Sequence, residues 1–167
     1  VRLAAASGLA SSGREEGVPL LIPMLKNSSK CVATFVAEML GETGSKEALE
    51  SLLGEVRNPA SGALSGAVRG LGHLDYPEAS RALASIVDGA NPNLRLEALK
   101  ALSRIDPPEY RKNLRVLLTD EDRQVRHETA RWLVRSGDRE GVDLLLSRKS
   151  DLFLLNAIRS PGPWKKL

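Results

Sequence analysis

A repeat of 31 residues runs through the chain and constrains its fold more strongly than any local pattern. Three positions of the repeat are the same in all five copies. The first is leucine, at Leu9, Leu40, Leu71, Leu102 and Leu133, and the second is also leucine, at Leu21, Leu52, Leu83, Leu114 and Leu145. The third lies between them and is glutamate, at Glu16, Glu47, Glu78, Glu109 and Glu140. Such a period is typical of stacked structural repeats, so we expect the array itself to be the domain.

Each copy contains two segments with helical spacing. In the fourth copy Leu94 and Ala98 are four residues apart, and Leu99 and Leu102 are three apart, which places all four on one face of a helix. A short turn and a second, glutamate-led apolar segment follow. We therefore predict two helices per copy, with copies at 1–31, 32–62, 63–93, 94–124 and 125–151.

Residues typical of helix ends stand at the expected places. Asn91 and Asp122 precede first helices as N-caps, whereas Gly41 and Gly72 follow them as C-terminal caps. In the middle of the Gly-rich stretch, Gly66 and Gly70 indicate close contacts between helices.

The turn before the second helix carries Asp75 in the third copy and Asp106 in the fourth. If these residues are N-caps, then Asp75 with Glu78, and Asp106 with Glu109, form capping boxes. A register shifted by one residue is the alternative. In both registers the glutamate lies in the first helical turn, where its charge interacts favourably with the helix dipole.

The unit V-R-x-x-A-x-x-x-L, followed by a turn, a glutamate and Val18 to Leu21, resembles the short HEAT-like repeat first associated with phycobilisome lyases. This resemblance covers residues 1–151. It implies an all-α fold, a right-handed α-α superhelix (a HEAT/armadillo-like solenoid) of about five two-helix repeats. Because the same unit occurs in lyases, regulators and scaffolds, the resemblance is specific for architecture rather than for function.

Both ends of the chain depart from the repeat. Residues 152–167 begin with an apolar run and are expected to form a C-terminal cap and tail, against which Trp132 packs. The first residue is Val1, which already occupies a helix position, so the first copy lacks its lead-in turn. We expect the chain to be a fragment with further repeats upstream.

No reactive constellation is visible in the sequence. His73 and His127 lie in different copies without carboxylates at ligand spacing, and the Gly-rich stretch lacks a phosphate-loop pattern. Cys31 is the only cysteine and is expected to be a small buried residue. The longest apolar runs are too short to span a membrane. We therefore predict no enzyme activity, no cofactor and no metal, and a reducing, cytoplasmic location.

Arginines and lysines recur in columns. Arg2, Arg95 and Arg126 share a position at which an arginine is expected to tie one copy to the next. Arg69, Lys100 and Arg131 form an outer ladder on the first helices. His73, Arg104 and Arg135 continue it one turn on, and we interpret the ladder as a solvated face.

A second group of basic residues lies on the second helices. Positions 19 and 22 of the unit share a helix face, because they are three residues apart. They carry Arg81 in the third copy and Lys112 and Arg115 in the fourth, with Arg111 beside them. Since the intervening leucine points inward, we expect this face to line the concave side. We predict Arg81, Arg111, Lys112 and Arg115 to bind an acidic segment or helix of another protein.

The function predicted from these features is a non-catalytic scaffold that mediates protein–protein interaction through its concave face. Two alternatives stay open. One is nucleic-acid binding, as in the HEAT-like alkylpurine glycosylases, against which the net charge of only +3 argues. The other is a bilin lyase or its partner subunit, which the resemblance suggests although no residue supports it.

Overall fold

The computed structural model describes residues 8, 15–27, 29–140 and 143. The chain divides into two compact units, Val1–Ile105 and Asp106–Leu167. Every regular element in the described part is helical, and the predicted all-α fold class is confirmed. The first helix of copy one and the predicted C-terminal cap lie outside the described residues.

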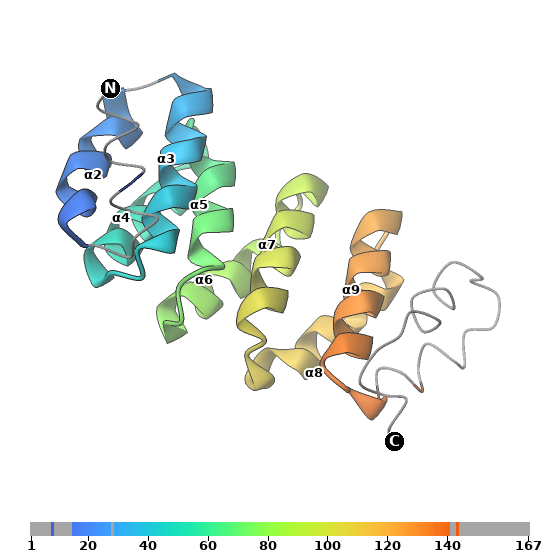
Figure 1. The fold of residues 1–167 in the computed structure, drawn as a ribbon. Helices are drawn as coiled ribbons and strands as arrows, with labels where there is room; N and C mark the ends of the chain where they lie inside the picture. Colours follow the sequence, from blue (N-terminus) through green and yellow to red (C-terminus); the bar gives the residue numbers. More distant parts are fainter. Residues whose placement is uncertain (1–7, 9–14, 28, 141–142, 144–167) are drawn as a thin grey trace. The chain divides into compact units, whose positions relative to one another are not determined.

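The first element of the first unit whose bounds are described is the 3-10 helix η1 (Glu15–Gly17). The α-helices that follow in its described part are α2 (Val18–Asn27), α3 (Lys30–Glu42), α4 (Lys46–Val56), α5 (Leu64–Leu71), α6 (Pro77–Val87) and α7 (Pro92–Ile105). First helices pack against first helices, α3 on α5 and α5 on α7 (Figure 1). Second helices do the same, since α4 contacts both α2 and α6. The unit therefore has two layers of helices, one from each half of the repeat.

The second unit starts within the fourth copy. Its elements in the described part are η2 (Pro108–Tyr110), α8 (Arg111–Leu114), η3 (Arg115–Thr119) and α9 (Arg123–Arg135). The second helical segment of this copy is therefore divided among η2, α8 and η3. Pro107 has extended backbone, as expected for a residue before another proline, and the first helical residue is Pro108.

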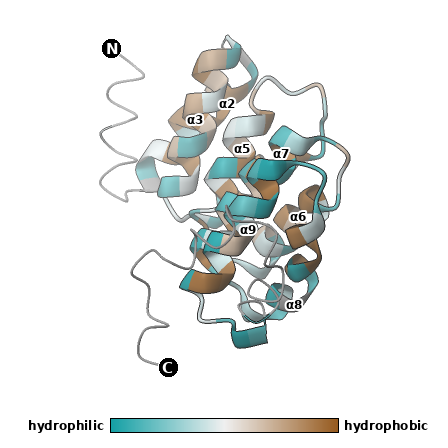
Figure 2. Cartoon of the chain, turned by 90° about the vertical axis from the view of Figure 1, so that its right-hand side faces the viewer, coloured by the Kyte–Doolittle hydropathy of each residue, from teal (hydrophilic) through white to brown (hydrophobic). Residues whose placement is uncertain are grey.

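The leucine columns form the core, as predicted. Leu40, Leu71, Leu102 and Leu133 have no exposed surface, and the same is true of Leu21, Leu52 and Leu83, while Leu114 is 4% exposed. Leu9 and Leu145 lie outside the described residues. Figure 2 shows apolar and polar residues within the same helices, as this one-sided burial requires.

Glycines bring α3 and α5 into backbone contact. A Cβ atom on Gly66 would overlap the carbonyl oxygen of Thr34, and one on Gly70 would lie 2.5 Å from the carbonyl oxygen of Ala37. Their prediction as close helix contacts is thus confirmed. Gly41, predicted as a cap, instead lies inside α3 and faces Gly70, because the helix continues to Glu42. Gly72 is the C-cap of α5, as predicted.

Two of the predicted first-helix caps are confirmed. The Asp122 carboxylate accepts hydrogen bonds from the backbone N–H groups of Gln124 and Val125 at the start of α9. The Asn91 side chain does the same at the start of α7, at 3.0 Å from the nitrogen of Asn93.

The predicted capping boxes are wrong by one residue. α6 begins after Tyr76 rather than after Asp75, and η2 begins after Pro107 rather than after Asp106. Neither of these N-cap residues has a capping side chain, whereas Ser45, at the equivalent position before α4, accepts a hydrogen bond from the nitrogen of Ala48. The column glutamates are consequently the second residues of these helices.

The repeat position that was predicted to cap the second helix has left-handed backbone in three copies. Gly44 has φ 71°, Asp106 has φ 51° and Gly137 has φ 69°. A non-glycine residue there is strained, yet Asp106 also accepts a hydrogen bond of 2.9 Å from the indole Nε1 of Trp132. Trp132 is only 1% exposed, whereas the cap against which it was predicted to pack lies outside the described residues.

The arginine column joins consecutive copies through backbone atoms. Arg95 donates to the carbonyl oxygens of Gly89 and Ala90, at 3.2 and 3.0 Å. Arg126 donates in the same way to Asp120 and Glu121, at 2.7 and 3.0 Å. Both arginines therefore fix the loop that precedes their own helix, as the predicted inter-copy role requires. Arg2 lies outside the described residues.

Candidate functional site

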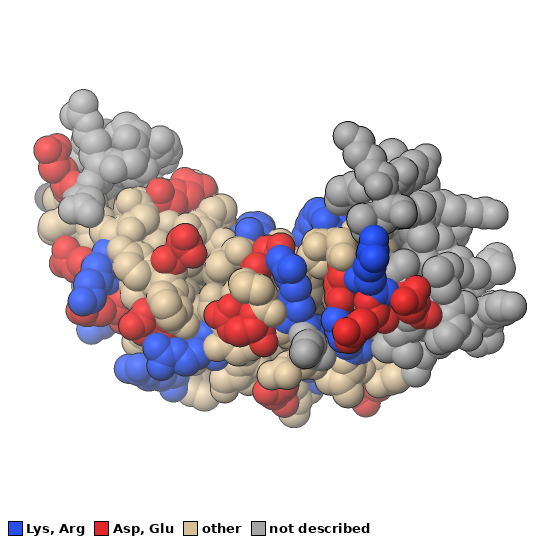
Figure 3. All heavy atoms as spheres, turned by 90° about the horizontal axis from the view of Figure 1, so that it is seen from below, with Lys and Arg blue, Asp and Glu red and all other residues tan. Residues whose placement is uncertain are grey.

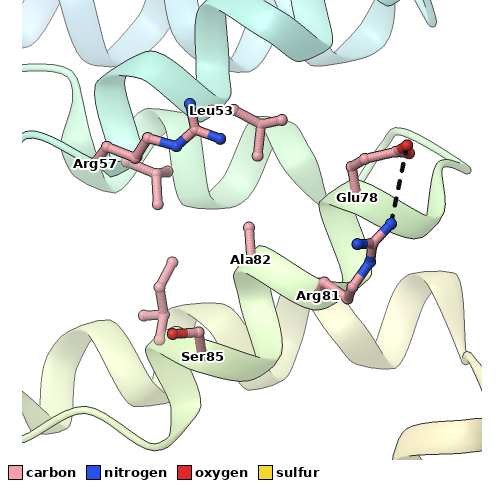
Figure 4. Close-up of a pocket in the computed structure, with 8 residues that line it drawn as sticks. Leu53, Arg57, Glu78, Arg81, Ala82 and Ser85 are labelled. Atoms are coloured by element: carbon pink, nitrogen blue, oxygen red, sulfur yellow. Dashed lines mark ion pairs between the residues drawn. The ribbon is translucent and has the colours of Figure 1, made fainter.

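A groove opens between two second helices of the first unit, α4 and α6. It encloses a volume of about 490 Å³. Figure 4 shows Leu53 and Arg57 projecting from α4, with Arg81, Ala82 and Ser85 facing them from α6. The complete lining is Leu53, Val56, Arg57, Glu78, Arg81, Ala82, Ser85 and Ile86.

The groove exists because the facing positions differ in size. Leu52 and Leu83, which point inward, hold the two helices on the common core. On the outer side, α6 places the short side chains of Ala82 and Ser85 opposite Leu53, which is half-buried and lines the groove. The result is an apolar floor that remains accessible from solvent.

The rim of the groove is charged. Arg81 and Glu78 approach within 3.9 Å, with side chains 67% and 53% exposed. An exposed pair at that distance contributes about 0 to 1 kcal/mol, so it leaves the Arg81 guanidinium available to a partner. Arg57 is exposed and forms no ion pair with any described residue.

The predicted binding residues fall in both units. Arg81 lies on α6 in the first unit, whereas Arg111 and Lys112 lie on α8 and Arg115 on η3 in the second. The Lys112 side chain is outside the described part of the structure.

Two of these arginines are held by carboxylates of their own unit. Arg111 forms two hydrogen bonds to Asp106, at 3.1 and 2.6 Å. Arg115 binds Asp138, with Nε 2.6 Å from Oδ2, and also pairs with Glu140. The hydrogen bond to Asp138 raises the pKa of Arg115, as do Glu140 and the charges of both partners. Arg81 is thus the predicted arginine whose charge is least engaged within the chain.

The outer ladder is also paired across copies. Arg69 on α5 pairs with Glu38 on α3, and with Glu97 on α7 at 2.9 Å. Burial opposes the Arg69 charge, but the hydrogen bonds and charges of the two glutamates outweigh it, so the pKa of Arg69 is raised. Arg104 lies 3.4 Å from the Nε2 of His73. Arg69 thus links three neighbouring first helices, whereas Lys100, Arg104 and Arg131 are exposed, as the predicted solvated face requires.

The histidines and the cysteine do not assemble a reactive centre. Burial lowers the pKa of His127, and the positive charge of Arg131 lowers it further. Cys31, predicted to be buried, is exposed because it shares a helix side with the exposed Phe35 rather than with the buried Ala33 and Val36.

No group of three metal-binding side chains occurs among the described residues. In the same part of the chain no helix has the length and apolar character of a membrane span.

Arg57 was missed by the sequence analysis, although a signal for it exists. Lys26 stands one repeat earlier in the same column, at the end of the preceding second helix. This signal is weak, because the next residues at the same repeat position are Asp88 and Thr119, which are not basic.

Charges of both signs are mixed on this side of the protein. Figure 3 shows basic and acidic atoms interspersed over the described surface that faces the viewer. Extended contact with a phosphate backbone favours a clustered basic stripe, which the described surface in this view does not show.

Comparison with known proteins agrees with the architecture. The chain is similar to the complex of CpcE and CpcF of phycocyanin lyase from Nostoc sp. PCC7120, with 20% identity and a TM-score of 0.65, over 94% of this chain and 68% of that chain. It is also similar to an engineered protein, with 22% identity and a TM-score of 0.53, over 96% of this chain and 88% of that one. No curated protein sequence matches it. The HEAT repeat family matches residues 1–72 and 80–152, and the chain belongs to that family.

Proposed function

We propose that the chain is a non-catalytic HEAT-repeat scaffold that binds another protein through the face formed by its second helices. The observation that carries this proposal is the groove between α4 and α6. Its apolar lining, to which Leu53 contributes from α4, is open to solvent, and two exposed arginines also line it. Apolar pockets flanked by arginine are typical of the energetically dominant parts of protein interfaces.

The charges at the groove favour a partner segment with carboxylates. Arg57 and Arg81 outnumber Glu78 at the rim, so an acidic group near them gains more attraction than repulsion. In the second unit Arg111 and Arg115 already have carboxylate partners. We therefore assign the acidic contact in the first unit to Arg81 and Arg57. The predicted binding by Arg111, Lys112 and Arg115 concerns the second unit by itself.

The similar lyase structure supports a protein partner in one respect. It is a complex of CpcE with CpcF, so a chain with this fold takes part there in a complex of two proteins. An identity of 20% carries the fold and not the lyase reaction. A bilin lyase and a nucleic-acid-binding protein remain the alternatives that the experiment has to separate.

Affinity purification from the source cell, followed by reconstitution with the purified partner, tests the proposal. The variant Arg57→Glu/Arg81→Glu reverses the groove charge, and Lys100→Glu/Arg104→Glu makes the same change on the exposed side of α7. We expect the first variant to lose the partner and the second to retain it, with equal helix content in both. Retention by the groove variant together with loss by the α7 variant would contradict the proposal. So would salt-dependent DNA binding, or bilin transfer, as the only activity found.

A further inference from the structure

A second groove, between α2 and α4, repeats the first one copy earlier. Its volume is about 380 Å³. Its lining consists of Ile22, Leu25, Lys26, Glu50, Ser51, Gly54, Glu55 and Asn58. Adding one repeat length of 31 residues to the first seven of these positions gives seven of the eight positions that line the α4–α6 groove. The two grooves are therefore equivalent sites of one array.

The correspondence holds position by position. Leu53, Val56 and Arg57 are the equivalents of Ile22, Leu25 and Lys26, one repeat later. Two lining residues have no equivalent in the other groove. Glu78 lines only the α4–α6 groove, and Asn58 lines only the α2–α4 groove.

The two grooves differ in charge. Glu50 occupies, in the α2–α4 groove, the position that Arg81 occupies in the α4–α6 groove. Glu55 stands where the later groove has the apolar Ile86. The earlier groove thus carries two carboxylates and Lys26, whereas the later groove carries two arginines and Glu78, so the sign of the net charge reverses between neighbours.

The residues that set this difference are accessible. Glu50 is exposed and forms no ion pair with any described residue. Arg81 has only the long, exposed contact with Glu78. Glu55 accepts a hydrogen bond from the Ser61 hydroxyl, so it contributes charge from a fixed position. A ligand that spans both grooves therefore meets a negative site and a positive site in a defined order.

We propose that the occupant of the two grooves is a single amphipathic helix of the partner protein with charges of opposite sign at its two ends. It places one apolar side chain in each groove, a basic group near Glu50 and an acidic group near Arg81 and Arg57. This inference rests on the proposed function and specifies its ligand.

The spacing of the grooves suits a helix. Neighbouring packed helices are about 8 to 10 Å apart, so neighbouring grooves are separated by a similar distance. Residues seven apart on one face of a helix are separated by about 10.5 Å along its axis. The walls of both grooves are themselves helices and offer no strand edge, so an extended peptide would leave its backbone groups unpaired with protein. A helix satisfies those groups internally.

Three synthetic helices, stapled on their outward side, test the inference on the intact chain. Each has two leucines seven residues apart. They differ in the groups beside the leucines, which are lysine and glutamate in the bipolar peptide, two glutamates in the acidic peptide and two lysines in the basic peptide. Dissociation constants are measured by fluorescence anisotropy for the wild type, Glu50→Arg and Arg81→Glu. Glu42→Arg, on the exposed side of α3, is the matched control.

We expect the wild type and Glu42→Arg to bind the bipolar peptide at least about tenfold more tightly than the other two. Glu50→Arg should prefer the acidic peptide, and Arg81→Glu the basic one. Preference of the wild type for the acidic peptide, or no binding of any peptide while the purified partner still binds, would overturn this inference and leave the proposed function standing. Self-association of the chain that Arg81→Glu abolishes would also overturn it, because the occupant would then be a second copy.

Discussion

The two layers of helices in the first unit pack in different ways. Between the first helices α3 and α5, Gly66 and Gly70 allow one backbone to touch the other. Within the same layer, Arg69 on α5 pairs with Glu38 on α3 and with Glu97 on α7. Between the second helices α4 and α6, the inward leucines are buried but the outer positions leave a groove. One layer of the repeat therefore supplies most of the close contact, and the other supplies accessible surface.

A repeat with invariant core positions can therefore have different roles in its two helical layers. The leucine columns are shared by both layers and hold the array together. The non-column positions decide whether neighbouring helices touch or stand apart. Substitutions in the first layer should consequently change stability, and substitutions at the groove should change binding.

The largest expected effect comes from the core that both layers share. Leu71, on α5, has no exposed surface, so Leu71→Ala removes buried apolar atoms and leaves a cavity. We expect a loss of about 2 to 5 kcal/mol in the free energy of unfolding. Urea denaturation followed by circular dichroism measures it, and a loss below about 0.5 kcal/mol, the level of an ordinary surface change, would show that the core register is wrong.

A smaller but more specific effect should come from the glycine contact. Gly66→Ala forces the new methyl group against the Thr34 carbonyl, which separates α3 from α5. We expect a loss of about 1 to 3 kcal/mol, as for other overpacked sites. Gly54→Ala is the matched control, because nothing lies within 4 Å of its added Cβ atom and the residue is exposed within α4. That substitution should stabilise the protein by about 0.5 to 1 kcal/mol. Equal effects of the two substitutions would remove the distinction between the layers.

Substitution of Asp106 tests whether its side-chain hydrogen bonds stabilise the second unit. Its carboxylate receives hydrogen bonds from Arg111 and from the buried Trp132. Asp106→Ala leaves the indole N–H unpaired and keeps the left-handed backbone, so we expect a loss of about 1 to 3 kcal/mol. Asp106→Asn retains an acceptor oxygen and should lose less. Tryptophan fluorescence during denaturation measures both, and equal losses would contradict the role of the hydrogen bonds.

The smallest expected effect is a dependence of the free energy of unfolding on pH, caused by His127 on α9. The pKa of His127 is lowered in the folded chain, so the unfolded chain binds its proton first as the pH falls. Stability should therefore decrease from the ordinary histidine pKa, near 6.5, down to the lower folded value. His127→Gln should flatten the dependence of the melting temperature on pH in that window. An unchanged profile would show that His127 does not contribute to it.

The sequence predicted the features that depend on the repeat itself. The leucine columns, the Asn91 and Asp122 caps and the contacts of Gly66 and Gly70 follow from spacing and residue type. The error at Gly41 arises because α3 continues to Glu42. The capping boxes are shifted because the second-helix segments begin one residue later than expected, after Tyr76 and after Pro107, and in the fourth copy Asp106 has left-handed backbone.

The groove and the ion pairs could not be predicted in the same way. The α4–α6 groove depends on how far apart two helices lie once Leu53 faces Ala82, which spacing along the chain does not reveal. Arg115 meets Asp138 across 23 residues that include all of α9, and the spacing of the two residues along the chain does not reveal this contact. Charge columns therefore identified a candidate face, but not which of its arginines are engaged within the chain.

Filling the groove is the most direct test of the claim that this layer binds a protein. Ser85 is exposed on α6 and lines the groove, so Ser85→Trp occupies the space without disturbing the buried leucines. The measurement is the dissociation constant of the purified partner, made alongside the free energy of unfolding. We predict that partner binding is lost while stability changes by less than about 0.5 kcal/mol. Unchanged affinity at unchanged stability would show that the partner does not bind in the α4–α6 groove.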